Sequence, residues 1–328
     1  MNLSLKKYLK ILLPILLGVF LIWYSLSKVP LNELLNYFKN ANYGWILLGM
    51  FCGLLSHLSR AYRWQFLLEP LGYKVKLGNS IMAVFSAYLI NYTIPRAGEV
   101  ARASILTTYE GVPFEKGFGT IVSERVADLL VMVGVIIITL FIQFDFIYQF
   151  FIEKLNPLHI VIGLIVLSVI AFLGFKLIKT SKSAFALKIK TFVLGLLEGV
   201  LSIFKMKKKW AFIAHTFFIW GMYIVMFYVT SFSLTELNNI PFGAILIGFI
   251  SASFSIAATN GGIGSYPIAV YAAFSLFAIP ESPSIAFGWI AWTSQTLLLV
   301  LGGGLSLMLL PIFNKKSHVK ISNNKDEV

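Results

Sequence analysis

Residues 118–142 read FGTIVSERVADLLVMVGVIIITLFI, and from Leu129 onward the stretch contains no charged residue. A helix needs roughly 20 predominantly apolar residues to cross the hydrocarbon core of a bilayer. The sequence contains five more stretches of comparable length and character, at residues 9–27, 43–60, 158–178, 210–233 and 285–310. We therefore predict an all-α, polytopic membrane protein with six full spans.

The composition agrees with lipid as the solvent. The 328 residues are 58% hydrophobic and 12% charged, whereas soluble domains are about a quarter charged. The net charge of +13 would suggest nucleic acid in a soluble chain, but here lysines cluster between apolar blocks, where they orient the chain and attract anionic lipid. We expect no nucleic-acid partner, and the single Cys52 excludes an intramolecular disulfide.

The N-terminus has lysines before an apolar run from Ile11 to Leu26, as a signal peptide does. The run is long, however, and no small-x-small cleavage pattern follows it. We expect an uncleaved first membrane helix.

Two further apolar regions, 79–117 and 242–280, are interrupted by proline and glycine. The first is broken at IPRAG, residues 94–98, and the second at NGGIG, residues 260–264. Together with the six spans they make about eight membrane segments.

Lysine and arginine orient the chain, because short cytoplasmic loops retain them. The N-terminus carries 3, residues 60–78 carry 4, residues 176–209 carry 9 and the tail after Pro311 carries 4, against 3 in all remaining loops. We expect a multi-pass protein of the cell inner (plasma) membrane with both termini, including the tail 311–328, in the cytoplasm. Each broken region then starts and ends on one side, as a re-entrant hairpin does, and the two enter from opposite faces. The alternative is a pair of ordinary short, tilted helices in each region.

These segments define one membrane domain over residues 1–328, built from inverted halves at 9–142 and 158–310. Each half also contains an amphipathic stripe that suits the membrane interface. The stripes comprise Leu31, Leu34, Leu35 and Phe38 in the first half and Phe185, Ile189, Phe192, Leu196 and Phe204 in the second. Inverted repeats with interrupted segments at matching positions are typical of carriers, whose site lies near the bilayer midplane.

The first candidate site is the turn of the first hairpin. Arg96, Glu99 and Arg102 are spaced to share one side of a helix, with Gly98 between them. Arginine offers planar donor forks that suit a lipid phosphate. The alternative is a cytoplasmic loop whose arginines pair with nearby glutamates at little energetic consequence.

The second candidate is a charged triad, Glu124, Arg125 and Asp128, near the start of an apolar span. Charges at bilayer depth cost about 2.5–3.5 kcal/mol each on insertion scales, so they must face protein or water. We predict an ion-pair network in which Arg96 or Arg102 balances the excess negative charge. A helix end whose side chains reach interfacial water is the competing interpretation.

The third candidate is the glycine turn of the second hairpin. Its glycines permit backbone conformations that other residues avoid, and successive N–H groups there can bind an anion at a helix N-terminus. The residues concerned are Asn260, Gly261, Gly262, Gly264 and Ser265. A flexible turn between two helices is the alternative.

Other polar residues of the membrane segments, His57, His215, Trp292, Ser294 and Gln295, are explained as well by contacts between helices. The four histidines lack metal-ligand spacing and no nucleophile is paired with a base, so we expect no enzyme, no metal and no cofactor.

Taken together, the three motifs resemble the flippase-like family built on the transmembrane domain of lysylphosphatidylglycerol synthase, the multiple peptide resistance factor group. They are PRxGExxR at 95–102, ERxxD at 124–128 and GGxG at 261–264. The resemblance implies a bacterial or archaeal inner membrane and an aminoacyl-phospholipid or lipid-linked sugar as substrate. Bifunctional members carry a soluble aminoacyl transferase domain, and this sequence ends 17 residues after Pro311, so we expect no lipid synthesis.

The function we expect is translocation or binding of an anionic phospholipid or a polyprenyl-linked headgroup. A second hypothesis is a non-transporting accessory subunit that docks an envelope glycosyltransferase or lipid synthase through its basic 176–209 face. A third, a membrane enzyme using Glu124 or Asp128 as base, needs a metal or nucleophile that the sequence does not offer.

Overall fold

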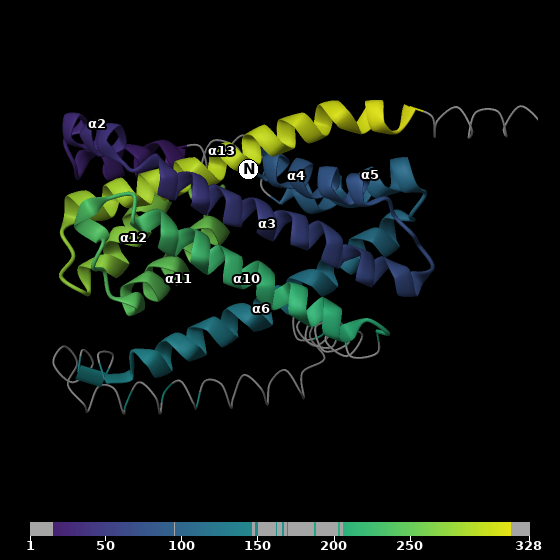
Figure 1. The fold of residues 1–328 in the computed structure, drawn as a ribbon. Coiled ribbons are helices and arrows are strands. Elements are labelled where there is room, and N and C mark those ends of the chain that lie inside the picture. Colours follow the sequence, from purple (N-terminus) through teal and green to yellow (C-terminus); the bar gives the residue numbers. More distant parts are fainter. Residues whose placement is uncertain are drawn as a thin grey trace, which may run out of the picture. The chain divides into compact units, whose positions relative to one another are not determined.

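The computed structural model describes residues 16–94, 96–145 and 206–315, with isolated positions at 148–149, 162, 166, 169, 187 and 203. Every secondary-structure element in these residues is helical (Figure 1), which confirms the predicted all-α class. The chain divides into two compact units. The first comprises Met1–Ile121 and Trp210–Val328, and the second comprises Val122–Lys209.

Three helices of the described chain are long and apolar enough to cross a membrane: α6 (Phe114–Ile142), α10 (Lys209–Ser231) and α13 (Glu281–Phe313). A fourth candidate is the bent pair of α2 (Leu31–Asn40) and α3 (Tyr43–Leu68, extended by a 3₁₀ turn), whose axes differ by 81°. All four overlap spans that the sequence predicts or residues directly beside such a span.

The remaining predicted segments are covered only in part. The span at 158–178 and the amphipathic stripe at 185–204 lie outside the described residues, apart from isolated positions. The helix Leu16–Ser27 is the described part of the span predicted at 9–27. The total of six spans and the inverted repeat therefore stay predictions.

Helix α2 contains the predicted first stripe. Leu34 is buried, while Leu31 and Leu35 are 58% and 57% exposed. Glu33 in the first turn and Lys39 in the last turn both complement the helix dipole. An apolar edge that stays exposed on a helix bent away from a span suits the membrane interface.

The two broken regions each form a pair of short helices that pack against each other (Figure 1). The first hairpin is α4 (Leu77–Thr93) with α5 (Ala97–Glu110), and the second is α11 (Phe242–Ala258) with α12 (Ser265–Ser275). None of the four reaches 18 residues. At 1.5 Å per residue the longest spans about 25 Å, less than the roughly 30 Å hydrocarbon core.

Helix α13 packs against both hairpins at glycines, whose lack of a side chain lets the neighbouring helices come close. A Cβ at Gly288 would meet the Cα of Pro267 in α12 at 2.5 Å, and one at Gly302 would meet the Phe85 ring of α4 at 2.5 Å. The second hairpin thus lies along the first half of α13, and the first hairpin along its second half. Two hairpins that entered from opposite faces would give this arrangement.

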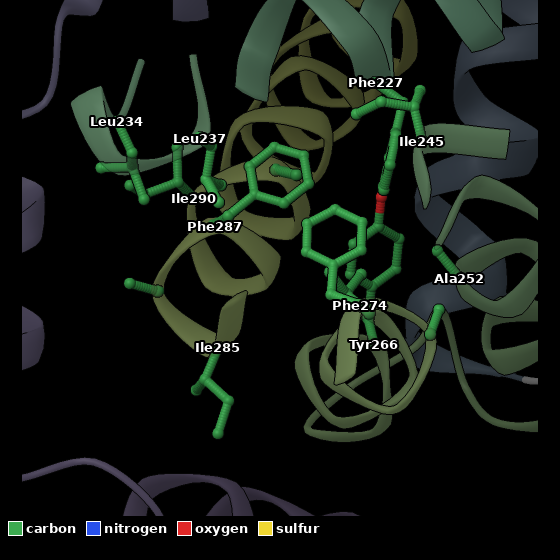
Figure 2. Close-up of a cluster of buried hydrophobic side chains, with 14 of the residues drawn as sticks. Phe227, Leu234, Leu237, Ile245, Ala252, Tyr266, Phe274, Ile285, Phe287 and Ile290 are labelled. Atoms are coloured by element: carbon green, nitrogen blue, oxygen red, sulfur yellow. The ribbon is translucent and has the colours of Figure 1, made fainter. Parts of the chain in front are cut away.

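A cluster of buried apolar side chains joins the second hairpin to α10 and α13 (Figure 2). Three phenylalanines form its centre. The ring of Phe287 stacks on that of Phe274 with centroids 5.7 Å apart and meets the ring of Phe227 edge-on at 5.0 Å. Aromatic pairs in these geometries contribute about 0.5–1.5 kcal/mol each beyond the area that they bury.

A buried amide pair closes the base of the first hairpin. Asn79 at the start of α4 and Asn314 after α13 exchange reciprocal side-chain hydrogen bonds of 2.9 and 2.7 Å. The Glu110 carboxylate at the end of α5 accepts from the Asn79 amide at 2.5 Å and from the Lys76 backbone N–H at 3.1 Å. Both asparagines are at most 1% exposed, so these bonds fix α4, α5 and α13 together at one end.

We expect Asn79→Leu to lower the free energy of unfolding by about 1–3 kcal/mol, because it leaves the Asn314 amide and the Glu110 carboxylate without their buried partner. Thermal unfolding of the purified protein in detergent measures the change. The matched control is Asn36→Leu, which removes an exposed Asn36–Asn40 amide pair of 2.8 Å on α2. Equal melting temperatures for the two variants would contradict the stabilising role of the buried Asn79–Asn314 pair.

The helix Leu16–Ser27 is held by the second hairpin and α13. The Trp289 indole N–H donates to the hydroxyl of Ser25, which is fully buried, at 3.0 Å. Just beyond this helix, the Lys28 ammonium lies 3.7 Å from the Glu281 carboxylate. The nearby Tyr24 hydroxyl and then Glu281 raise the pKa of Lys28 above its ordinary value.

Candidate functional site

One face of α3 carries cationic and aromatic side chains into the interior of the first unit. Arg60 and Arg63 are 2% and 0% exposed, His57 is 3% exposed and Trp64 is fully buried. His57, Arg60 and Trp64 follow one another at helical spacing on one side of α3, with Arg63 beside them. The sequence analysis counted both arginines in the stretch 60–78 that follows the predicted span, whereas α3 continues as a helix to Leu68 and buries both of them.

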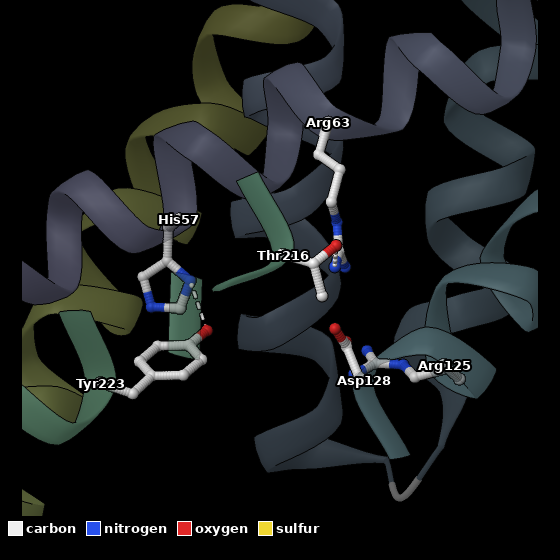
Figure 3. A network of polar contacts seen from close by, with 6 residues as sticks. All are labelled: His57, Arg63, Arg125, Asp128, Thr216 and Tyr223. Carbon is white, nitrogen blue, oxygen red and sulfur yellow. Dashed lines mark hydrogen bonds and ion pairs between the residues drawn. The ribbon is translucent and has the colours of Figure 1, made fainter. Parts of the chain in front are cut away.

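Contacts with α10 orient the two α3 arginines, of which Figure 3 shows Arg63. The Arg63 Nη1 donates to the Thr216 hydroxyl at 2.8 Å, and its guanidinium carbon lies 5.2 Å from the centroid of the Phe212 ring. The Arg60 guanidinium lies 6.0 Å from the centroid of the Tyr223 ring. The Thr216 hydroxyl in turn donates to the Phe212 carbonyl at 2.7 Å, so the acceptor that Arg63 uses is itself fixed.

Arg102 reaches the same turn of α3 from the first hairpin. Its guanidinium carbon lies 3.8 Å from the centroid of the Trp64 ring, and the residue is 3% exposed. The Trp64 indole N–H donates to the Thr120 hydroxyl at 2.8 Å, and that hydroxyl donates to the Gly117 carbonyl at 2.7 Å. Three buried arginines thus lie on or against α3 within the first unit.

The tip of the first hairpin differs from the sequence prediction in one respect. Arg96 precedes α5 with φ 60° and ψ 11°, in the left-handed region, and is exposed. It therefore does not share a helix face with Glu99 and Arg102, because a residue at the N-cap has non-helical dihedrals. The side-chain oxygen of Asn91 accepts from the Gly98 N–H at 2.7 Å and so caps α5 from the preceding helix. Pro95 lies outside the described residues.

The tip of the second hairpin is a turn with three glycines in the left-handed region. Gly261, Gly262 and Gly264 have φ of 65°, 80° and 70°, which L-residues with a side chain adopt only at a cost. The turn is closed by the Tyr266 N–H, which donates to the Gly262 carbonyl at 2.9 Å. Ser265 is the first residue of α12. Its hydroxyl lies 2.6 Å from the hydroxyl of Ser255 in α11.

The two tips meet beside the middle of α13. A Cβ at Gly261 would run into the Tyr92 ring from the end of α4. The Tyr92 hydroxyl lies 3.1 Å from the Thr296 hydroxyl, and the Trp292 indole N–H donates to the Gly261 carbonyl at 2.8 Å. The structure thus brings the glycine turn of the second hairpin against Tyr92, four residues before Arg96.

The charged triad lies in the second unit. Glu124 and Asp128 are 0% and 6% exposed. The side chain of Arg125 is 43% exposed, and its Nη1 lies 4.0 Å from an Asp128 carboxylate oxygen (Figure 3). The wider network with Arg96 or Arg102 stays a prediction.

The other polar residues take part in contacts between helices. The His57 ring lies among the rings of Phe85, Tyr88 and Tyr223, and a ring nitrogen lies 3.5 Å from the Tyr223 hydroxyl. These four side chains come from α3, α4 and α10 and tie the first hairpin to that pair of helices.

His215 of α10 bonds to α3, whereas Ser294 bonds within α13. A ring nitrogen of His215 lies 2.8 Å from the Ser59 hydroxyl, and the Ser294 hydroxyl donates to the Ala291 carbonyl at 2.9 Å. Over the described ranges, no group of three or more histidine, cysteine or acidic side chains could hold a metal ion.

Sequence reasoning missed Arg60, Arg63, Trp64 and the aromatic contacts of all three buried arginines. A signal was present, because His57, Arg60 and Trp64 repeat at the spacing of one helix face within an otherwise apolar segment. The sequence analysis ended the segment at residue 60, so it did not consider residues on both sides of that position as one helix face.

Comparison with known proteins places the chain among membrane proteins. The family described as "Lysylphosphatidylglycerol synthase TM region" matches residues 11–304. The chain is similar to an UPF0104 membrane protein of Methanocaldococcus jannaschii, with 25% identity over 80% of this chain and 83% of the relative. It is similar to another of Pyrococcus horikoshii, with 23% identity over 86% and 90%. A shorter match, 36% identical over 23% of this chain and 12% of the relative, links it to the glycosyltransferase AglD of Haloferax volcanii.

Proposed function

The chain belongs to the lysylphosphatidylglycerol synthase TM region family, and from this premise we propose that it binds the headgroup of a membrane lipid and translocates it across the bilayer without a covalent step. The substrate class is a phospholipid, including an aminoacyl-phospholipid, or a lipid-linked sugar. The protein acts in the cell inner membrane with both termini in the cytoplasm.

The observation that carries the proposal is the burial of Arg102, in the second helix of the first hairpin, against Trp64. A charge at bilayer depth is costly and in membrane proteins generally marks a path for a polar substrate. Interrupted hairpins expose backbone groups that require a polar or protein-lined surrounding, and carriers place their substrate there.

Each of the three sequence-predicted clusters has a role in this proposal. Arg102, with Arg96 nearer the surface, binds the headgroup phosphate. Glu124 and Asp128 balance positive charge or bind a headgroup that is itself cationic. The turn at 260–265 supplies backbone N–H donors, as a helix N-terminus after a glycine turn can.

The test is reconstitution of the full chain in liposomes that contain a phospholipid with a fluorescent headgroup. We expect the protein to make the inner-leaflet headgroups accessible to a membrane-impermeant quencher. Arg102→Ala should slow this exchange about tenfold or more, since a charge-assisted hydrogen bond contributes roughly 1.5–3 kcal/mol.

Two variants control this experiment. Arg102→Lys keeps the charge but loses the planar fork and the stacked geometry, so it should restore only part of the rate. Lys74→Ala removes an exposed lysine and should match the unaltered protein. Equal exchange rates for Arg102→Ala and the unaltered protein would refute the mechanism.

A second candidate function is an accessory subunit of an envelope glycosyltransferase or lipid synthase. The partial similarity to glycosyltransferase AglD favours it. Co-purification of such an enzyme with the chain, combined with the absence of lipid exchange in liposomes, would support this function over translocation.

A further inference from the structure

The helix Leu16–Ser27 lies directly against the glycine turn of the second hairpin. A Cβ at Gly264 would lie 2.6 Å from the carbonyl carbon of Leu21 and 3.0 Å from the Cα of Ile22. Glycine permits two backbones to come this close because it has no side chain. The middle of the helix therefore covers the turn to which the proposed function assigns the N–H donors for a headgroup.

The opposite side of this helix is apolar and exposed. Val19, Phe20 and Trp23 are 60%, 52% and 62% exposed, and at 100° per residue they lie on the side of the helix away from Leu21 and Ile22. In a membrane protein such a face meets lipid tails, which are as apolar as these side chains. The helix is about 10–12 Å in diameter with its side chains, and it forms a single layer between the turn and the bilayer.

The helix is fixed at its C-terminal end. Ser25 is fully buried and accepts the bond of 3.0 Å from the Trp289 indole N–H. Val29, just beyond the helix, is 1% exposed and belongs to the buried apolar cluster. The Lys28 ammonium lies 3.7 Å from the Glu281 carboxylate. These contacts attach residues 25–29 to the rest of the first unit.

Towards Leu16 the same side of the helix is less closely packed. Gly18 lies two turns before Ser25 on the inner side, yet a Cβ at Gly18 would have nothing of the described chain within 4 Å. Its neighbours Leu17 and Val19 are exposed. A segment with few buried contacts separates from its surroundings at low free energy. The helix is therefore held firmly at one end and weakly at the other.

Two other elements contact the turn, and both are held more firmly. The Tyr92 ring of α4 lies against Gly261, and the buried amide pair fixes α4 at its base. The Trp292 indole N–H of α13 donates to the Gly261 carbonyl at 2.8 Å, and its ring meets that of Trp289 edge-on at 5.7 Å. Of these three elements, the helix Leu16–Ser27 can leave the turn with the fewest contacts broken.

We propose that the helix Leu16–Ser27 is a lateral gate, which pivots about residues 25–29 and opens a path from the bilayer to the glycine turn. The inference rests on the proposed function, because a lipid whose acyl chains stay in the bilayer brings its headgroup to the turn from the side. Residues 28–30, between this helix and α2, absorb the change in backbone dihedrals, as residues at the ends of elements do in other hinges. Opening of the gate then limits the rate of translocation.

Distances between two spin labels on the full chain in phosphatidylglycerol nanodiscs test the movement. Cys52→Ala first removes the single cysteine of the sequence. One label is placed at Val19→Cys, near the weakly held end, or at Ser27→Cys, near the fixed end. Its partner is at Leu301→Cys, an exposed position of α13. We expect two distances for the Val19 pair and one for the Ser27 pair. A single distance for each pair would overturn the gate.

Gly18→Leu tests whether lipid exchange depends on this movement. The leucine side chain occupies the open space on the inner side of the helix and adds an apolar contact at the weakly held end. We expect the second Val19 distance to disappear and headgroup exchange in liposomes to slow about tenfold, with an unchanged or higher melting temperature. Gly304→Leu is the matched control, because Gly304 of α13 also has open space around its ideal Cβ. It should alter neither the distances nor the exchange.

The outcomes separate the gate from the proposed function. Two Val19 distances without lipid exchange in any variant would refute translocation, whereas a gate to a binding site would stand. Lipid exchange with a single Val19 distance would refute the gate and leave translocation standing. If Gly18→Leu abolishes the second distance but does not slow exchange, lipid takes another path, and the gate is refuted in that case too.

Discussion

Gly264→Ala should prevent stable folding of the second hairpin. Gly264 has φ 70°, and a Cβ there would run into the backbone of Leu21 and Ile22 in the N-terminal helix. The strained dihedral costs about 1–2 kcal/mol in a non-glycine residue, and a clash with backbone adds about 1–3 kcal/mol or more, because neither backbone can move away cheaply. We expect a loss of about 3 kcal/mol, seen as a lower melting temperature in detergent and poor recovery from the membrane.

Two other glycines separate these contributions. Gly72 has φ 88° and nothing within 4 Å of its ideal Cβ, so Gly72→Ala carries only the dihedral cost. Gly304, within α13, has an ordinary dihedral and open space, so Gly304→Ala should be neutral or slightly stabilising. If Gly264→Ala is no more harmful than Gly72→Ala, the close contact with the N-terminal helix does not contribute to stability.

Gly98→Ala should have the second-largest effect, on the first hairpin. A Cβ at this position would run into the Ala87 carbonyl oxygen and would lie 2.7 Å from the Asn91 side-chain nitrogen. The methyl group therefore forces α5 away from α4 and weakens the Asn91 cap of 2.7 Å on the Gly98 N–H. We expect a loss of about 2–3 kcal/mol of stability, together with loss of lipid exchange, because Arg102 lies one turn further along α5.

The control for Gly98→Ala is Gly117→Ala in α6. A Cβ at Gly117 would lie 3.8 Å from Ala103 and Val112, an ordinary van der Waals separation. Thermal unfolding and lipid exchange should both resemble those of the unaltered protein. A Gly98→Ala variant that unfolds at the same temperature as Gly117→Ala would show that the helices can separate without cost.

The positions of the helices could be predicted because they follow from local composition. Apolar length marks α6, α10 and α13, and glycine and proline mark the breaks at 94–98 and 260–264. Backbone groups in lipid must be satisfied within the segment, so a break in an apolar region is already informative before any contact is known.

The boundary of α3 and the burial of its arginines were mispredicted for a physical reason. Hydropathy ends an apolar segment at the first arginine, whereas a helix can continue past a buried arginine when groups of another helix accept its hydrogen bonds. One acceptor of Arg63, the Thr216 hydroxyl, lies 153 residues away in the sequence. No local pattern contains that information.

The junction between the hairpin tips was likewise foreseen only in part. The glycines at 261–264 were singled out, but Tyr92 and Thr296 were not, and Trp292 was considered only as a general polar contact. Their arrangement depends on how α4, α11 and α13 pack, and side chains 204 residues apart form the Tyr92–Thr296 contact. Residue type indicates that such groups can bond, and only the packing determines which of them do.

The attachment of the helix Leu16–Ser27 has a consequence for biosynthesis. Its Ser25 is bonded to Trp289, a residue 264 positions later. At about 5–20 residues per second the ribosome needs tens of seconds to make the intervening chain. This helix thus leaves the ribosome well before the residues of α13 that it contacts, and until they are made, lipid or the insertion machinery must cover its apolar surface.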